Sequence, residues 1–264
     1  MPLFDGIEEF KNVDPALQWA IFIVAALIVV VGIVSVFIAV WLWFKYHKFN
    51  RTENSKHLSG EDAARQILDK NGLQHIRVSV FGSLLFGNSY SHFFKKVRIR
   101  RLTAKRTTIT SLAMGAEKSA LAILDKEGDK DMKTRIILTP LMYFGPFAFI
   151  PLLVIGVAID IIMFNFTGVA TVLAAVFGLA IYVISFLLSL MTLKTEKKAQ
   201  ARALTILKQD NMATDEEIEK MKELFKLYNI QYVNDLILEF LQMLLKILQF
   251  VAKIQGSSRS ASND

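Results

Sequence analysis

The sequence predicts a mainly α-helical, polytopic membrane protein with three to four transmembrane helices and a small cytosolic α+β domain. Three observations predict it. The 264-residue chain is 53% hydrophobic, with a mean hydropathy of +0.39, which is more apolar than an ordinary soluble domain. Its apolar residues are concentrated in runs long enough to cross a bilayer, and basic residues gather at one end of these runs. The stretch between the first two runs shows the patterns of short helices and strands instead.

The predicted organisation follows from these runs. The first run, 17–44, carries no charge and is followed by aromatic and basic residues, as expected of an uncleaved membrane anchor. The expected segments are an extracytoplasmic N-terminus over 1–16, transmembrane helices over 17–44, 136–164 and 169–193, a cytosolic domain over 45–135, cytosolic charged helices over 194–228, an amphipathic or fourth transmembrane helix over 232–254, and a disordered tail over 255–264.

Three groups of basic residues predict the orientation in the membrane. They follow the first run, precede the second and follow the third: Lys45, Lys48 and Arg51; Lys133 and Arg135; Lys194, Lys197, Lys198 and Arg202. Because cytoplasmic loops are enriched in Lys and Arg, all three groups place the main domain in the cytoplasm and the N-terminus outside. We therefore expect a multi-pass protein of the plasma membrane.

Polar side chains occur inside two of the apolar runs. Asp160 lies near the end of the second run, where it is either a functional intramembrane acid or a solvated residue at the membrane surface. Six polar residues at helical spacing form one stripe on the last helix: Asp235, Glu239, Gln242, Lys246, Gln249 and Lys253. That helix lies on the membrane, spans it with the stripe facing other helices, or pairs with a partner helix.

Composition excludes several kinds of site. The chain has no Cys, so disulfides and Cys-ligated zinc or iron–sulfur sites are excluded. None of its four His residues stands three or four positions from another, so no helix presents a paired-His metal site. The net charge of +7 is more typical of cytoplasmic-loop bias in a membrane protein than of a nucleic-acid surface.

Two helices and two strands are predicted within the cytosolic domain. The helices cover 59–70, with Ser59 as its N-cap, and 107–128. The strands cover 76–81 and the residues around 97–100, where apolar and basic side chains alternate. The second helix has apolar residues at helical spacing, which predict one buried face: Ile109, Leu112, Ala113, Ala116, Ala120, Ile123 and Leu124.

Three stretches resemble a known family. They are 58–73 (LSGEDAARQILDKNGL), 121–128 followed by Pro140 and Gly145, and 193–204, which contains Glu196. Together with the order of segments, they resemble the membrane zinc metallopeptidases of bacteria, the YugP-type neutral zinc metallopeptidase family. The resemblance implies that the cytosolic domain is metallopeptidase-like and that the family's working motif, HEVGH, belongs on the helix at 107–128. In that motif two His bind zinc and the Glu activates the metal-bound water.

At the motif position this chain departs from the family. Aligned without gaps, HEVGH falls on Glu117, Lys118, Ser119, Ala120 and Leu121. Both zinc-binding His are then replaced, by Glu117 and Leu121, and the catalytic Glu is replaced by Lys118. Shifting the alignment by one residue makes Glu117 the base but still leaves alanines at both ligand positions. The third ligand that the resemblance implies, Glu196, is present.

These replacements predict that zinc, the family's cofactor, is lost and that the site is not catalytic. Two interpretations of Glu196 remain open. It pairs with a basic neighbour such as Lys197 or Arg202, or the ammonium of Lys118 sits where the metal was and neutralises Glu117 or Glu196.

A run of basic residues is the most distinctive charge feature of the domain: Lys95, Lys96, Arg98, Arg100, Arg101, Lys105 and Arg106. On a membrane-anchored domain, such a run is expected to bind anionic lipids or an acidic membrane-protein partner. Nucleic acid is a weaker alternative, although Phe93 and Phe94 lie close by. The remaining interpretation is a solvated strand edge that is kept charged against aggregation.

The sequence thus favours a catalytically inactive, membrane-embedded relative of zinc metallopeptidases that acts as a scaffold or binding subunit. An active enzyme with non-standard ligands is the first alternative, and it requires His57, His75 and His92 to converge beside Glu196. A transporter or channel component is the second, and it requires an oligomer because each chain has so few spans.

Overall fold

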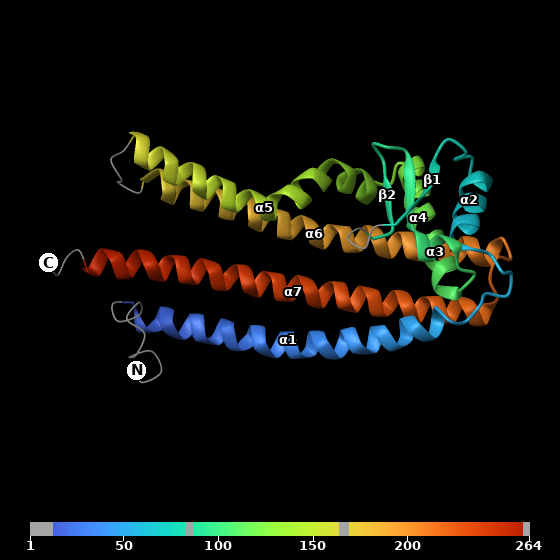
Figure 1. Cartoon of the computed structure of the whole chain (residues 1–264), viewed down its shortest axis with the longest axis horizontal. Coiled ribbons are helices and arrows are strands. Elements are labelled where there is room, and N and C mark those ends of the chain that lie inside the picture. The colour runs from blue at the N-terminus through green and yellow to red at the C-terminus, as the bar shows by residue number, and fades with distance from the viewer. Residues whose placement is uncertain (1–12, 83–86, 164–168, 261–264) are drawn as a thin grey trace. The chain divides into compact units, whose positions relative to one another are not determined.

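The computed structural model describes residues 13–82, 87–163 and 169–260, and it describes their side chains except at 141–150 and 253–260. Figure 1 shows the succession of elements along the chain. The chain forms two compact units. One comprises the part up to Leu42 together with the part from Ile230 onward, and the other comprises Trp43–Asn229. Helices α1 (Pro15–Phe49) and α7 (Asp215–Ser260) contribute residues to both units.

The first unit is a pair of long helices. The start of α1 packs against the end of α7 through a small apolar cluster formed by Val13, Leu17, Ile21, Leu245, Leu248 and Ala252. Further along, the side-chain amide of Asn234 donates a hydrogen bond to the hydroxyl of Ser35. Much of the remaining surface of α1 exposes large apolar side chains, among them Val29, Val30, Val36 and Phe37. Such a surface is typical of a helix that faces lipid rather than water.

The second unit contains a helical hairpin of α5 (Lys130–Met163) and α6 (Val169–Gln209). Asp160 joins its two arms, because its carboxylate accepts hydrogen bonds from the backbone of Ala170 at 2.9 Å and from both the backbone and hydroxyl of Thr171. These are orphan donors of the first turn of α6, so Asp160 caps that helix. The solvated alternative for Asp160 is wrong within this structure, since the residue is buried.

The long helices differ from the predicted segments at several ends. Helix α5 already begins at Lys130 and continues through the prolines at 140, 146 and 151. The charged region 194–228 is the end of α6 and the beginning of α7, where Thr214 and Glu217 form the N-terminal capping pair. Helix α7 extends to Ser260, beyond the predicted helix end at residue 254.

Two helices of the described residues are long and apolar enough to cross a membrane: Pro15–Phe49 and Val169–Gln209. The described residues of α5 contain a shorter apolar stretch, Pro151–Met163. On α7, four residues of the predicted polar stripe are exposed: Asp235, Gln242, Lys246 and Gln249.

The two helices predicted between the first two apolar runs are confirmed. Helix α2 (Gly60–Lys70) begins after Ser59, whose hydroxyl accepts a hydrogen bond from the backbone of Asp62. Helix α4 (Ile109–Glu127) is capped by Thr108 and ends at Gly128, whose φ of 71° suits glycine. All seven residues of its predicted apolar face are buried.

A three-stranded sheet accompanies these helices. The order is β1 (Arg77–Phe81), β3 (Lys96–Arg100) and β2 (Ser89–Ser91), so that β3 is central, parallel to β1 and antiparallel to β2. Both predicted strands are confirmed, whereas β2 was not predicted, because its three residues, Ser-Tyr-Ser, carry no alternating apolar pattern. A short helix, α3 (Arg101–Lys105), follows β3 directly.

Two glycines let α2 and α4 approach closely. A Cβ atom added to Gly115 would lie 2.3 Å from the carbonyl oxygen of Gly60, and one added to Gly60 would lie 2.4 Å from the carbonyl oxygen of Thr103. No side chain fits either position without moving backbone. This contact fixes α4 against α2 only two residues before Glu117.

Candidate functional site

The candidate site lies on α4, at the positions where the family resemblance puts its motif. Glu117 is only 4% exposed, and Leu121, one helical turn further along, is 1% exposed. Helix α4 packs against both α2 and α6. Because burying a charged carboxylate is costly unless it is paired, Glu117 requires a partner inside the fold.

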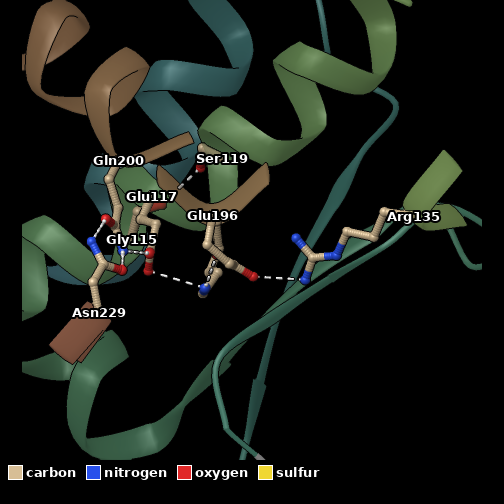
Figure 2. A network of polar contacts seen from close by, with 8 residues as sticks. Gly115, Glu117, Ser119, Arg135, Glu196, Gln200 and Asn229 are labelled. Atoms are coloured by element: carbon tan, nitrogen blue, oxygen red, sulfur yellow. Dashed lines mark hydrogen bonds and ion pairs between the residues drawn. The ribbon is translucent and has the colours of Figure 1, made fainter. Parts of the chain in front are cut away.

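Lys118 supplies that partner and joins it to Glu196. The Nζ atom of Lys118 lies 3.0 Å from Oε2 of Glu117 and 3.0 Å from Oε2 of Glu196. The other oxygen of Glu196 lies 2.6 Å from Nη2 of Arg135, an ion pair that Figure 2 shows. Two carboxylates and two cations therefore form one closed group, with no formal net charge.

Two side-chain amides, those of Gln200 and Asn229, form a hydrogen-bonded chain that ends at Glu117. The side-chain amide of Gln200 donates to Oε1 of Glu117 at 2.9 Å, and Gln200 and Asn229 exchange hydrogen bonds with each other. Figure 2 shows the three side chains in a row. The hydroxyl of Ser119 donates instead to the backbone oxygens of Ala64 and Gly115, which ties this turn of α4 to α2. The carboxylate of Glu117 is thus oriented by fixed donors.

The pKa values reflect this arrangement. Burial raises the pKa of Glu117, an effect that the charge of Lys118 opposes. Glu196 is partly buried, which raises its pKa, but the charges of Lys118 and Arg135 outweigh that effect and lower its pKa from 4.5 to about 2. Burial works against the charged form of Lys118, but the two carboxylates prevail and raise its pKa. Lys118 is therefore a permanent cation at neutral pH.

The residues at the site do not fit a zinc ion. Leu121 offers no donor atom, and Lys118 already places a positive charge between the two carboxylates. Nη1 of Arg135 is buried without a hydrogen-bond partner in the described part of the chain. Its N–H groups are hydrogen-bond donors, and a guanidinium nitrogen cannot serve as a zinc ligand. A divalent cation added to this neutral group would leave an uncompensated charge in a buried place. No group of three or more His, Asp or Glu residues suited to a metal occurs within 13–82, 87–163 and 169–260.

The histidines of the enzymatic alternative have partners elsewhere. Nδ1 of His57 lies 3.2 Å from Glu53, and Nδ1 of His92 lies 2.6 Å from Asp125, which also accepts a hydrogen bond from Tyr90. His75 is exposed beside β1. The structure does not assemble these histidines with Glu196 into a metal site.

Of the two interpretations of Glu196, the pairing with Lys197 or Arg202 is wrong, because its ion pairs are with Lys118 and Arg135, while Arg202 pairs with Glu127. Sequence reasoning missed the roles of Arg135, Gln200 and Asn229. The sequence presents Arg135 only as one of the basic residues before the second apolar run. A signal does exist for Gln200, which lies one helical turn after Glu196.

The predicted basic run is divided between two elements. Lys96, Arg98 and Arg100 belong to β3, Lys95 precedes that strand, and Arg101, Lys105 and Arg106 lie in or just after α3. Lys95 and the last three residues are exposed, as is Arg100.

Comparison with known proteins agrees with the resemblance. The model of a family described as "Putative neutral zinc metallopeptidase" matches residues 23–251. No curated protein and no solved structure matches the chain significantly.

Proposed function

Since the chain belongs to the neutral zinc metallopeptidase family, we propose that it is a non-catalytic member, in which Lys118 replaces the metal and the protein acts as a scaffold or binding subunit at the membrane. The observation that carries this proposal is the position of the Lys118 ammonium, 3.0 Å from both Glu117 and Glu196.

The two carboxylates occupy positions that the resemblance assigns to zinc ligands. Glu117 stands at the first His of the motif and Glu196 at the third ligand, although 79 positions separate them in the sequence. Ligands of one metal must converge on one point, and these two side chains converge on the Lys118 ammonium. This convergence supports the ungapped alignment over the shifted one, because the shifted alignment puts Ala116 and Ala120 at the ligand positions.

The chemistry of a metallopeptidase needs a metal-bound water and a base that takes its proton. At the position of that base this chain has Lys118, whose raised pKa keeps it protonated. A protonated ammonium cannot accept a proton, and Leu121 cannot bind a metal. We therefore expect no peptide hydrolysis at this site. What the site retains is a rigid junction between α4, α5 and α6, which suits a binding subunit.

We further propose that the protein is a multi-pass plasma-membrane protein with its N-terminus outside and with residues 45–135 and 194–228 in the cytoplasm. The basic groups at the ends of the apolar runs support this orientation. The absence of Cys permits single-cysteine labelling in intact cells. We expect Glu9→Cys and Thr167→Cys to react with an impermeant maleimide and Lys56→Cys to react only after lysis. The reverse pattern contradicts the orientation.

Zinc content tests the loss of the metal site. The full-length protein, purified in detergent and dialysed against zinc, is compared by metal analysis with the variant Glu117→His/Lys118→Glu/Leu121→His, which restores the motif. The wild type is expected to hold less than about one tenth of an equivalent of zinc, and the restored variant about one equivalent. Stoichiometric zinc in the wild type overturns the proposal, as does zinc-dependent peptidase activity that a chelator abolishes.

A further inference from the structure

The outer face of the three-stranded sheet is strongly basic. In the strand register, Arg77 lies opposite Lys96, and Ser89 lies opposite Arg98, so each pair projects to the same face. Val97 and Ile99 are buried on the other face. The outer face therefore carries Arg77, Lys96, Arg98 and Arg100, with Ser79, Ser89 and Ser91 beside them. None of the three strands contains an acidic residue.

Most of the basic residues on or near the sheet form no ion pair within the part of the chain that the structure describes. Elsewhere in the same unit basic residues pair with carboxylates, as in Lys45–Glu223, Arg65–Asp69 and Lys198–Asp129. By contrast, seven residues on or near the sheet form no ion pair within the described residues: Arg77, Lys95, Lys96, Arg98, Arg101, Lys105 and Arg106. Like charges gathered in this way repel one another, and an anionic surface relieves that repulsion.

Exposed apolar side chains accompany the charges. Between residues 50 and 136, the large apolar side chains that the described structure exposes are Phe93 at 69%, Phe94 at 66% and Leu102 at 66%. The ring of Phe94 lies 4.9 Å from Nζ of Lys96 and 5.8 Å from Cζ of Arg98, so it belongs to the basic face. Apolar tips beside cations are the combination that binds the boundary between headgroups and acyl chains.

We propose that this surface, the lipid-docking face, binds the anionic phospholipid headgroups of the membrane in which the protein is anchored. It comprises Arg77 on β1, Lys95–Arg100 on and before β3, Arg101–Arg106 in and after α3, and the apolar side chains of Phe93, Phe94 and Leu102. The Arg and Lys side chains contact phosphates, and the apolar side chains enter the interface. The proposal is independent of whether the α4 site holds zinc.

A lipid surface fits these residues better than nucleic acid does. The sheet follows α1, which has the higher mean hydropathy of the two candidate membrane spans among the described residues, so a bilayer that holds α1 lies within reach of the sheet. Nucleic acid stacks on aromatic platforms, but Leu102 offers no such platform, whereas a bilayer accepts it as readily as Phe.

A single-cysteine label tests the proposal on the full-length protein. Ser89→Cys carries a nitroxide, and the protein is reconstituted in nanodiscs of phosphatidylcholine alone or mixed with phosphatidylglycerol. The anionic discs are expected to protect the label from a water-soluble relaxant, and the neutral discs are not. Salt at about 1 M, where the Debye length is about 3 Å, is expected to remove the protection.

Two triple variants test the role of charge. One removes three cations from the lipid-docking face: Lys95→Gln/Lys96→Gln/Arg98→Gln. The control removes three cations from other elements: Lys70→Gln/Lys208→Gln/Lys222→Gln. Each removed cation of the docking face is expected to lower the docked-to-undocked ratio about fivefold, and the control is expected to leave it unchanged. Phe93→Ser/Phe94→Ser is expected to weaken docking without changing its salt dependence.

Three outcomes overturn the proposal. The label is protected equally in both kinds of disc, the control variant loses as much protection as the charge variant, or single-stranded RNA protects the label in neutral discs.

Discussion

The ammonium of Lys118 lies 3.0 Å from a carboxylate oxygen of Glu196, a residue 78 positions further along the chain. Adjacent Glu117 and Lys118 share one buried turn of α4, and Glu196 reaches them from α6. With Arg135 of α5, the group joins three helices through charges that compensate one another. Removing one of these charges is therefore expected to lower the free energy of unfolding more than removing two charges of opposite sign does.

Replacing Lys118 by Met removes the cation that both carboxylates share. Lys118→Met is expected to lower the free energy of unfolding by about 3–5 kcal/mol, because one buried and one partly buried carboxylate are left close together with only Arg135 to compensate them. Denaturant unfolding of the protein in detergent measures this loss. The matched control is Lys222→Met, which breaks an exposed pair with Glu219 and is expected to cost less than about 1 kcal/mol.

The double variant Glu117→Gln/Lys118→Met tests whether charge balance is the cause. It removes one charge of each sign, leaves the pair of Glu196 with Arg135, and keeps a side-chain oxygen as acceptor for Gln200. It is expected to recover at least about half of the loss caused by Lys118→Met. If the double variant is as unstable as the single one, the packing of the lysine rather than its charge stabilises the site.

Acid is expected to weaken the group through Glu196. The folded pKa of about 2 is below the ordinary value of 4.5, so the ionised form contributes stability above pH 4.5, and this contribution is lost as the pH falls through 2. The contribution amounts to at most about 3 kcal/mol. Glu117 has a raised pKa and acts in the opposite direction, since its protonation on acidification relieves the cost of burying its charge.

The comparison of wild type with Glu196→Gln isolates this effect. The difference in their unfolding free energies is expected to be constant above pH 4.5 and to decrease between pH 4.5 and 2. A difference that does not change over this range shows that Glu196 is not ionised and paired in the folded state.

Gly115 is expected to be irreplaceable in α4. Gly115→Ala places a methyl group 2.3 Å from the carbonyl oxygen of Gly60. The helices must separate, at a cost of about 1–3 kcal/mol, despite the better helix propensity of Ala. Gly32→Ala in α1 is the control, because nothing lies within 4 Å of the added atom, and it is expected to be neutral or stabilising. Thermal unfolding that affects both variants equally contradicts the close approach.

Asp160 is expected to stabilise the hairpin as a cap rather than to carry substrate or protons. Asp160→Ala leaves the backbone donors of Ala170 and Thr171 without their acceptor and is expected to cost about 1–2 kcal/mol. Asp215→Ala, at the exposed start of α7, is expected to leave the stability nearly unchanged, because its ion pair with Lys208 is exposed to solvent. Detergent-solubilised unfolding compares the two, and an unchanged stability of Asp160→Ala speaks against the capping role.

Local patterns predicted the helices and strands between the first two apolar runs well. The cap of Ser59 and the apolar face of α4 each depend on residues within one or two helical turns, and both are confirmed. The extents of the long helices were less predictable. Charged residues beyond position 193 mark the end of an apolar run but not the end of a helix, since α6 continues to Gln209.

The site was predictable only in part, because its partners come from distant positions. The replacement of the motif directed attention to Glu117, Lys118 and Glu196, and the structure brings these three together. Nothing in the local sequence indicates that Arg135 turns toward Glu196 or that Asn229 meets Gln200. Such contacts depend on helix packing, which a single sequence does not specify.

Anomalous diffraction at the zinc absorption edge tests the central claim most directly, on crystals of the full-length protein grown with zinc. The account predicts no anomalous peak between the carboxylates of Glu117 and Glu196, and electron density for the Lys118 ammonium at that point. An anomalous peak coordinated by both carboxylates, with the Lys118 side chain displaced, would contradict it.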